Sequence, residues 1–420
     1  MRDIEPKSRR RAVITGMGPI TACGIGREAF WGAIRGGRSG IGPVTHFDAS
    51  AFRARTAGEV SDWDPTAFFP PHRLKRLDRY AQFSVASALL ALDDAGLPWS
   101  KEKPDPRAGV SFGTALGGIA NAEAEHAHFL KKGSRGVNQT LALQVFGGSA
   151  HCNIAIELGY RGVGTTNSNS CASGAVSVGE ALRYIRDGWA DVMIAGGAEA
   201  PLCPLTFGAF DFIRTMSRWQ GEPAALACRP FDMDRDGFVM GEGACSLVVE
   251  EYEFARRRGA RIYAEVLGYS LNNEAFHMTS PLPSGESVIA CMRAALADAG
   301  VTAGDIGYIN AHASSTKMND ANEAMCIRTV FGENPPPVSG TKPFTAHPLG
   351  ATSAMETAIC ALALTEQWLP PTLHHRTPDP EVGLDVVPEA GRNHEFAYAM
   401  NNAFGFGGIN SCLVLGKISG

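Results

Sequence analysis

Short apolar strands alternate with alanine-rich helices along this chain, and the alternation limits its possible folds more than any other feature. The strands end at or near glycine, and the clearest helices span residues 80–95 and 287–299. Strands that alternate with helices form sheets whose faces those helices largely cover. We therefore predict an α/β fold, with strands in these ranges: 11–18, 108–113, 191–197, 306–311 and 397–402.

The chain also divides into two comparable halves. Its 420 residues are enough for a large core and for more than one structural unit. Residues 256–259, Arg-Arg-Arg-Gly, end a predicted helix, and a new strand begins in residues 262–268 with no flexible linker between them. The sequence therefore predicts one α/β unit over residues 1–260 and a second over residues 261–420.

Composition and charge exclude several classes of protein. The net charge of −5 argues against a nucleic-acid binder. Residues 1–11 are polar and basic without an apolar signal core, and no run reaches the ~18–20 apolar residues of a membrane span. We expect a cytoplasmic protein without a membrane span.

Metal, disulfide and dinucleotide motifs are absent from the sequence. Its 10 cysteines form no C-x-x-C pair, so we expect neither a zinc site nor disulfides. No full G-x-G-x-x-G pattern follows the first strand, which argues against a dinucleotide site.

Cys171 lies where a strand is expected to meet a helix. Residues 162–166 are strand-like, and apolar residues recur at helical spacing from Ala175 to Ile185. A helix N-terminus stabilises a thiolate by about 0.3–1 kcal/mol, which makes Cys171 a candidate nucleophile. A buried structural cysteine in a small-residue turn fits the same segment.

Two histidines follow short apolar segments. His312 directly follows the strand predicted at residues 306–309, and His347 ends the segment 340–347. Functional groups in α/β folds gather at the carboxyl ends of strands. Each histidine taken alone is equally compatible with an ordinary polar loop, but together with Cys171 they form a candidate catalytic set.

Ordered motifs over nearly the whole chain carry a family resemblance. The chain resembles the elongating ketosynthases of the β-ketoacyl-acyl-carrier-protein synthase II type, in the thiolase superfamily. The motifs that match are Val13-Ile14-Thr15-Gly16-Met17-Gly18, Ser170-Cys171-Ala172-Ser173-Gly174, Ala190 to Glu199, Arg229-Pro230-Phe231-Asp232, Arg235-Asp236-Gly237-Phe238, His277 to Pro281 and Asn402 to Asn410. The resemblance implies a layered αβαβα fold made of two similar halves.

The resemblance also implies a role for each catalytic candidate. Cys171 would accept the acyl group, and His312 and His347 would be the decarboxylation pair. Lys342 would support the histidines and keep them neutral. The backbone N–H groups of Cys171 and Phe406 would form the oxyanion hole, and the Phe406 ring would be a mobile gate.

Further positions match family residues that support the site or bind substrate. The supporting residues are Glu356, Asp320 and Glu323; the candidates for the pantetheine arm are Ser314 and Thr316; and those for the acyl tunnel are Leu116, Thr206 and Phe210. The resemblance implies no metal and no cofactor of the chain's own, because the phosphopantetheine arrives on a carrier protein.

The chain departs from the family pattern in three places. The first histidine loop usually contains His-Gly-Thr-Ser-Thr, but residues 312–316 are His-Ala-Ser-Ser-Thr. Residues 167–170, Asn-Ser-Asn-Ser, are unusually polar beside a thiolate, and such a run inside a strand would need hydrogen-bond partners. Thr206-Phe207 is bulkier than the usual small pair, which indicates a restricted or redirected acyl pocket.

The reaction implied is a decarboxylative Claisen condensation of an acyl thioester with malonyl-acyl-carrier protein. The resemblance implies a homodimer or a heterodimer with a homologous subunit, paired along a sheet edge near residues 163–170. We also expect an acidic carrier protein that docks by charge, because basic residues cluster in this net-acidic chain: Arg73, Lys75, Arg76 and Arg135. Arg214 matches a further docking position of the family. A non-catalytic chain-length partner subunit, a thiolase-like enzyme and a protein that only binds acyl groups are the alternatives. Fatty-acid and type II polyketide pathways both remain open.

Overall fold

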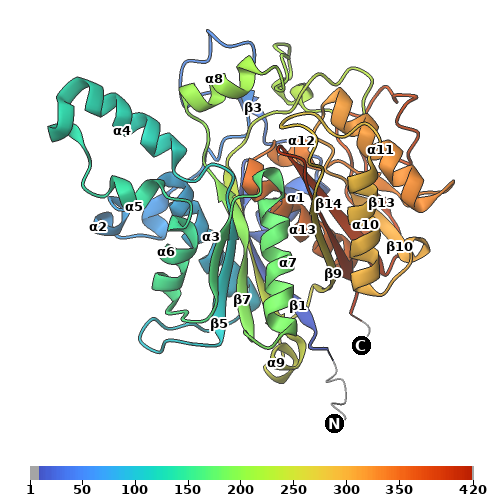
Figure 1. Cartoon of the computed structure of the whole chain (residues 1–420), viewed down its shortest axis with the longest axis horizontal. Helices are drawn as coiled ribbons and strands as arrows, with labels where there is room; N and C mark the ends of the chain where they lie inside the picture. The colour runs from blue at the N-terminus through green and yellow to red at the C-terminus, as the bar shows by residue number, and fades with distance from the viewer. Residues whose placement is uncertain (1–8, 419–420) are drawn as a thin grey trace.

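The computed structural model describes residues 9–418, and its strands join into one strongly twisted sheet (Figure 1). The sheet has the order β11-β10-β14-β15-β9-β1-β8-β7-β5-β6, and β2 pairs with β1 outside that order. Its strands are β1 (Ala12–Thr21), β2 (Gly24–Ile25), β5 (Ala108–Gly113), β6 (Gly164–Asn167), β7 (Val192–Glu199), β8 (Gly243–Glu251), β9 (Ala264–Asn273), β10 (Ile306–Asn310), β11 (Val338–Ser339), β14 (Tyr398–Gly405) and β15 (Ile409–Gly416). Two short ribbons lie outside it: β3 (Gly42–Pro43) with β4 (Thr56–Ala57), and β12 (Trp368–Leu369) with β13 (Arg392–Asn393).

The helices of the described chain include the long helix Leu349–Glu366, which is buried along nearly its whole length, and many that cover the outside. They are α1 (Arg27–Arg35), α2 (Pro71–Leu74), α3 (Arg79–Ala95), α4 (Ile119–Lys132), α5 (Leu141–Val145), α6 (Ser149–Leu158), α7 (Ser173–Arg186), α8 (Pro204–Phe212), α9 (Tyr252–Arg257), α10 (Glu286–Ala299), α11 (Lys317–Phe331), α12 (Lys342–Thr345) and α13 (Leu349–Glu366). Within residues 9–418 no helix is long and apolar enough to cross a membrane. The polar segment 1–8 lies outside the described residues.

The two halves of the sheet repeat one topology. From the centre outward, β1, β8 and β7 are antiparallel neighbours, and β7, β5 and β6 are parallel neighbours. The second half repeats this pattern, with β9, β15 and β14 antiparallel and β14, β10 and β11 parallel. The halves join where β1 pairs antiparallel with β9. The predicted division into two similar halves is therefore confirmed for the fold.

Five layers result from the way the helices pack. α7 and α13 contact each other and strands of both halves, so they form the central layer, while α3 covers β1 and β8 and α10 covers β9 and β15 on the outside. A Cβ atom on Gly174 of α7 would lie only 2.6 Å from the backbone nitrogen of Ala354 of α13. This close approach needs small residues, and it explains the many glycines and alanines of the chain. The predicted layered αβαβα fold is confirmed, and each predicted strand lies within a few residues of an observed one.

Candidate active site

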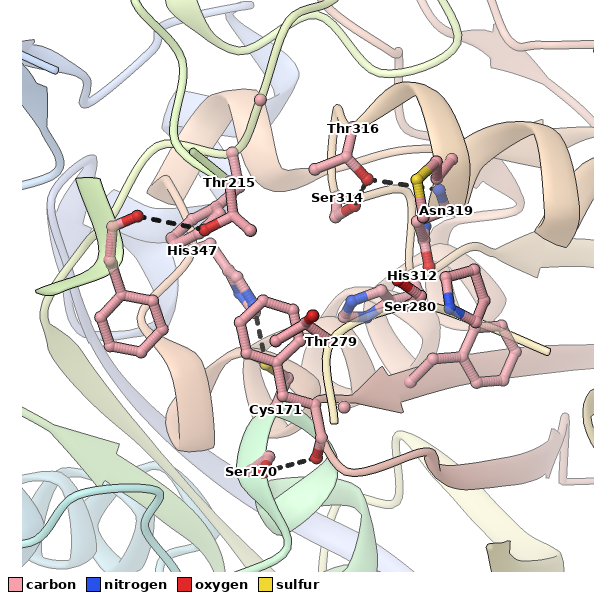
Figure 2. A pocket seen from close by; sticks show the side chains of 18 of the residues that line it. Ser170, Cys171, Thr215, Thr279, Ser280, His312, Ser314, Thr316, Asn319 and His347 are labelled. Atoms are coloured by element: carbon pink, nitrogen blue, oxygen red, sulfur yellow. Dashed lines mark hydrogen bonds between the residues drawn. The ribbon is translucent and has the colours of Figure 1, made fainter. Parts of the chain in front are cut away.

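A cavity of about 720 Å³ opens where loops from both halves meet, and Cys171, His312 and His347 all line it (Figure 2). Cys171 lies in the turn of residues 170–172 that leads from β6 into α7. His312 follows β10, and His347 lies just before α13. The carboxyl ends of β6 and β10 thus bring together side chains that are far apart in the sequence.

Cys171 and His347 are in direct contact in the cavity. Nε2 of His347 lies 3.1 Å from Sγ of Cys171, and both side chains are buried. Burial raises the pKa of the Cys171 thiol to about 12, against the opposing charge of Lys342. Burial and then the Lys342 charge hold the pKa of His347 well below its usual value. The resting pair is therefore a neutral thiol beside a neutral imidazole, not a thiolate–imidazolium pair.

Thr352 sets the orientation of the His347 proton. Its hydroxyl lies 2.9 Å from Nδ1 of His347, and the Thr352 side chain makes no other hydrogen bond within residues 9–418. In the tautomer that we assign, the Thr352 hydroxyl donates to Nδ1. The proton of the neutral ring is then on Nε2, which faces the cavity and Cys171.

A buried ion pair lies behind the two histidines. Nζ of Lys342 lies 2.6 Å from Oε1 of Glu356 and also donates to the backbone carbonyl of His312. Burial, the charge of Lys342 and then His347 keep the pKa of His312 well below its usual value. Lys342 therefore holds the first histidine loop in place and disfavours protonation of both imidazoles.

Two further carboxylates shape the first histidine loop. Glu323 accepts the backbone N–H groups of His312 at 2.9 Å and Ala313 at 2.8 Å. Asp320 accepts the N–H of Phe231 at 3.0 Å and lies 3.5 Å from the buried guanidinium of Arg235. Glu323 on α11 thus holds the loop after β10 directly, while Asp320 holds Arg235, which donates to the Thr316 carbonyl at 3.4 Å.

The turn after β14 brings backbone donors to the sulfur. Burial raises the pKa of the Cys171 thiol, while the nearby backbone N–H of Phe406 lowers it. A Cβ atom on Gly405 would lie 3.2 Å from the backbone nitrogen of Cys171, so the two backbones approach closely. The N–H groups of Cys171 and Phe406 are therefore near enough to serve one oxyanion on an acyl group attached to the sulfur.

Comparison with known proteins places this geometry in a family. The N-terminal domain model of the β-ketoacyl synthases matches residues 9–255, and their C-terminal domain model matches residues 263–376. The chain belongs to the β-ketoacyl synthase family. It is an enzyme of the acyltransferase class, as the resemblance of the sequence predicted.

Individual relatives extend over almost the full length of this ketosynthase. A curated relative, 3-oxoacyl-[acyl-carrier-protein] synthase 2 of Vibrio harveyi, is 39% identical over 98% of the chain and 100% of the relative. Among solved structures, the ishigamide ketosynthase/chain length factor aligns with a TM-score of 0.92 and 37% identity. A type II polyketide ketosynthase in complex with its acyl-carrier protein aligns with a TM-score of 0.91 and 34% identity. Both structural alignments cover 98% of this chain and 100% of the other chain.

The structure brings most of the predicted substrate positions of this ketosynthase to the cavity. Ser314, Thr316, Leu116 and Phe210 line it, as does Phe406, whose ring stacks on Phe210 with centroids 6.2 Å apart. Thr206 does not line it: the side chain is buried beside Phe207, which belongs to the apolar cluster under the pocket. Thr206 therefore has no direct contact with the cavity in this conformation.

The predicted docking residues differ in how free their charges are. Lys75, Arg76, Arg135 and Arg214 are exposed, and Arg214 also lines the cavity. Arg73 is half-buried, donates to Asn153 at 3.1 Å and lies 3.8 Å from Glu157. Its charge is therefore partly neutralised within the chain, which makes it the weakest of the docking candidates.

The polar run 167–170 finds its partners inside the chain. In this run only Asn167 belongs to β6; its side chain donates to the Ser173 carbonyl at 3.1 Å and to the Ser177 hydroxyl at 2.9 Å. The amide of Asn169 donates to Asn167, and the hydroxyls of Ser168 and Ser170 donate to backbone carbonyls. The run therefore ties the nucleophile turn to its neighbouring loops.

Sequence reasoning missed two positions that order the site. Glu199, at the end of β7, accepts backbone N–H groups of Ala115 and Leu116 beside the cavity and of Gly350 at the start of α13. Burial raises the pKa of Glu199 to about 7. Thr352 was missed as the partner of His347. A carboxylate at the end of a wholly apolar strand was the available signal for Glu199.

The described residues show neither a candidate metal site nor a disulfide bond. Residues 9–418 contain no group of three or more His, Cys, Asp or Glu side chains that could hold a metal ion. All ten cysteines are unpaired, and eight of them are buried.

Proposed function

We propose that the chain condenses an acyl thioester with malonyl-acyl-carrier protein to give a β-ketoacyl thioester, with loss of carbon dioxide. The observation that carries the proposal is the cavity in which Nε2 of His347 lies 3.1 Å from Sγ of Cys171, with His312 beside them. In the first half-reaction, Cys171 attacks the acyl thioester. The acyl–sulfur bond to Cys171 forms, and the carrier thiol leaves with the proton.

The second half-reaction uses the histidines as donors. The bond between the malonyl carbon and its carboxylate breaks, carbon dioxide leaves, and the electron pair moves onto the thioester oxygen as an enolate. Neutral His312 and His347 donate N–H groups to that oxygen, and preorganised donors of this kind are each worth about 10²–10³ in rate. The carbanion attacks the acyl-Cys171 carbonyl. The N–H groups of Cys171 and Phe406 hold the oxyanion until the thiolate leaves.

Supporting roles follow from the contacts around this set. We assign Lys342 and Glu356 to keep the imidazoles neutral, and Glu323 and Asp320 to hold the loop of His312. Ser314 and Thr316 would bind the pantetheine arm at the cavity wall, and their hydroxyls already lie 2.9 Å apart. The chain would need no cofactor of its own, because phosphopantetheine comes with the carrier protein.

Intact-mass spectrometry of the enzyme tests the proposal. We expect acyl-carrier proteins of varied acyl length to leave one acyl group on Cys171, and malonyl-carrier protein then to discharge it as the β-ketoacyl product. The chain-length profile would also separate fatty-acid from polyketide elongation, which the sequence leaves open. An enzyme that binds the carriers but never carries an acyl group on Cys171 would contradict the proposal.

We propose that two chains pair along β6, the last strand of the first half-sheet. α4 projects away from the sheet (Figure 1) and buries none of its own residues, and apolar side chains are exposed on α4 and α5: Phe129, Leu130 and Leu143. An open strand edge and an apolar arm together fit a second ketosynthase-like subunit, identical or homologous. The two units 1–260 and 261–420 would then be the halves of each subunit. A stable monomer in light scattering would contradict the pairing.

Carrier docking should depend on the positive charges of Arg214, which lines the cavity, and of the exposed Arg76. The double variant Arg214→Glu and Arg76→Glu should associate with an acidic carrier protein about tenfold more slowly at low salt, because its attraction is lost. Arg257→Glu is the matched control, since Arg257 is exposed on α9 at the opposite end of the molecule from α8 (Figure 1). Stopped-flow association at two salt concentrations measures the effect. Equal rates for the double variant and the control would rule out docking through these arginines.

A further inference from the structure

The turn between β14 and β15 carries Phe406 over the nucleophile. Gly407 and Gly408 follow Phe406 with φ of 90° and 71°, values that glycine adopts without strain. The Phe406 ring stacks on Phe210 at the cavity wall. Residues 405–408 therefore form a short turn, the gate turn, which is closed over Cys171 in this structure. Gly407 and Gly408 allow it to change conformation.

Several contacts hold the gate turn closed. The Gly407 N–H donates to the Met278 carbonyl and the Gly408 carbonyl accepts the Glu274 N–H, both at 2.8 Å. The hydroxyl of Ser170 donates to the Phe406 carbonyl at 2.9 Å, drawn as a dashed line from Ser170 in Figure 2. Within the described chain, this is the one hydrogen bond from a side chain to the gate turn.

Ser170 is held rigidly in the position from which it makes this bond. Its φ is 49°, in the left-handed region that serine rarely adopts. Its own carbonyl accepts the Ser173 hydroxyl at 2.7 Å, at the start of α7. The Ser170 hydroxyl therefore belongs to the same rigid turn as the nucleophile. It donates to the Phe406 carbonyl, while the Phe406 N–H lies near the Cys171 sulfur.

We propose that Ser170 is a latch that holds the gate turn closed over Cys171 and so controls how readily a long acyl chain reaches the sulfur. The inference rests on the proposed function, because it takes Phe406 as the gate of an acyl site. Opening the turn breaks the bond from Ser170 to Phe406, while the hydroxyl stays with the nucleophile turn. Ser170 acts through Phe406 and is a positioning residue, not a catalytic one.

Alkylation of Cys171 by two reagents tests the latch without requiring condensation. Chloroacetamide is small, whereas N-dodecyl chloroacetamide needs the gate to open for its chain. Intact-mass spectrometry measures the rate at which each reagent labels Cys171. The quantity compared is the ratio of the rate with the long reagent to the rate with the short reagent. Ser170→Ala should raise that ratio about two- to tenfold, the range expected for losing one hydrogen bond from the closed state.

Matched variants separate the latch from a general loosening of the turn. Ser168→Ala should keep the wild-type ratio, because the Ser168 hydroxyl bonds the Ala115 carbonyl and not the gate turn. Ser170→Gly removes the hydroxyl and also relieves the unfavourable φ, so it should raise the ratio as Ser170→Ala does. In a Phe406→Ala background the ratio should already be high, and Ser170→Ala should add nothing.

Some results of these experiments would contradict the latch alone, and another would also contradict the acyl site at Cys171. An unchanged ratio in Ser170→Ala and Ser170→Gly, with Cys171 still labelled, would overturn the latch and leave the proposed function standing. A further rise from Ser170→Ala in the Phe406→Ala background would also overturn it, because the serine would then act without the gate. Failure of the long reagent to label wild-type Cys171 under any condition would count against an acyl site at Cys171 and against the latch with it.

Discussion

Cys171→Ala should lose condensation by at least about 10⁴-fold while carbon dioxide release from malonyl-carrier protein stays measurable. The acyl group needs a covalent acceptor, and among the side chains of the cavity the Cys171 thiol is the one beside both His347 and the Phe406 N–H. Decarboxylation needs donors at the malonyl oxygen, and these remain in the variant. Carbon dioxide release and intact mass of the acyl-enzyme, measured side by side, give both results.

His347→Ala is the reciprocal variant. It should still carry an acyl group on Cys171, while carbon dioxide release falls about 10²–10³-fold, because one of two preorganised donors is gone. Thr352 then loses its partner, but the Cys171 turn keeps the backbone contacts that shape it. Condensation by Cys171→Ala, or wild-type carbon dioxide release by His347→Ala, would show that the roles are assigned wrongly.

The fold was predictable because its signals are local. Residues 108–113 and 192–199 are short runs whose apolar side chains are buried on both faces, and their composition alone indicates covered strands. The helix 79–95 begins at Asp78, whose side chain accepts the Ala81 N–H, and ends at Gly96 in a left-handed conformation. These are start and stop signals that a sequence displays directly.

The site was predictable only in part, because its contacts are long-range. Cys171 and His347 are 176 positions apart, and nothing in either segment shows that they meet. The family resemblance supplied that pairing and the place of Lys342. It did not supply the bond from Ser170 to Phe406, 236 positions away, because the resemblance assigns the Ser170 side chain no role.

Several side chains have other surroundings in the structure than the sequence led us to expect. Asn167 to Ser170 were expected to need partners inside a strand, but only Asn167 belongs to β6, and the others bond across the turn. Thr206 was expected to face the acyl tunnel, but its buried side chain does not line the cavity. Whether a side chain faces a cavity or the core depends on the crossing of α8 with its neighbours, which the sequence of α8 does not display.

Lys342→Met should destabilise the protein by about 3–5 kcal/mol, because it leaves a buried carboxylate without its partner. Lys342 and Glu356 are almost fully buried at 2.6 Å, and Oε2 of Glu356 has no partner among the described residues. The His312 carbonyl would lose its donor as well. Thermal or urea unfolding measures the loss. The double variant Lys342→Met with Glu356→Gln should recover most of the stability, since no buried charge remains.

The same double variant separates structure from catalysis. The Lys342 charge lowers the pKa of both His312 and His347, so without it both pKa values should rise. An imidazolium would protonate the enolate before it attacks acyl-Cys171, so condensation fails once the histidines protonate. The acid limb of the pH–rate profile of condensation should therefore move to higher pH, even in the stable double variant. A double variant that is stable and keeps the wild-type pH profile would show that Lys342 supports the fold but does not tune the histidines.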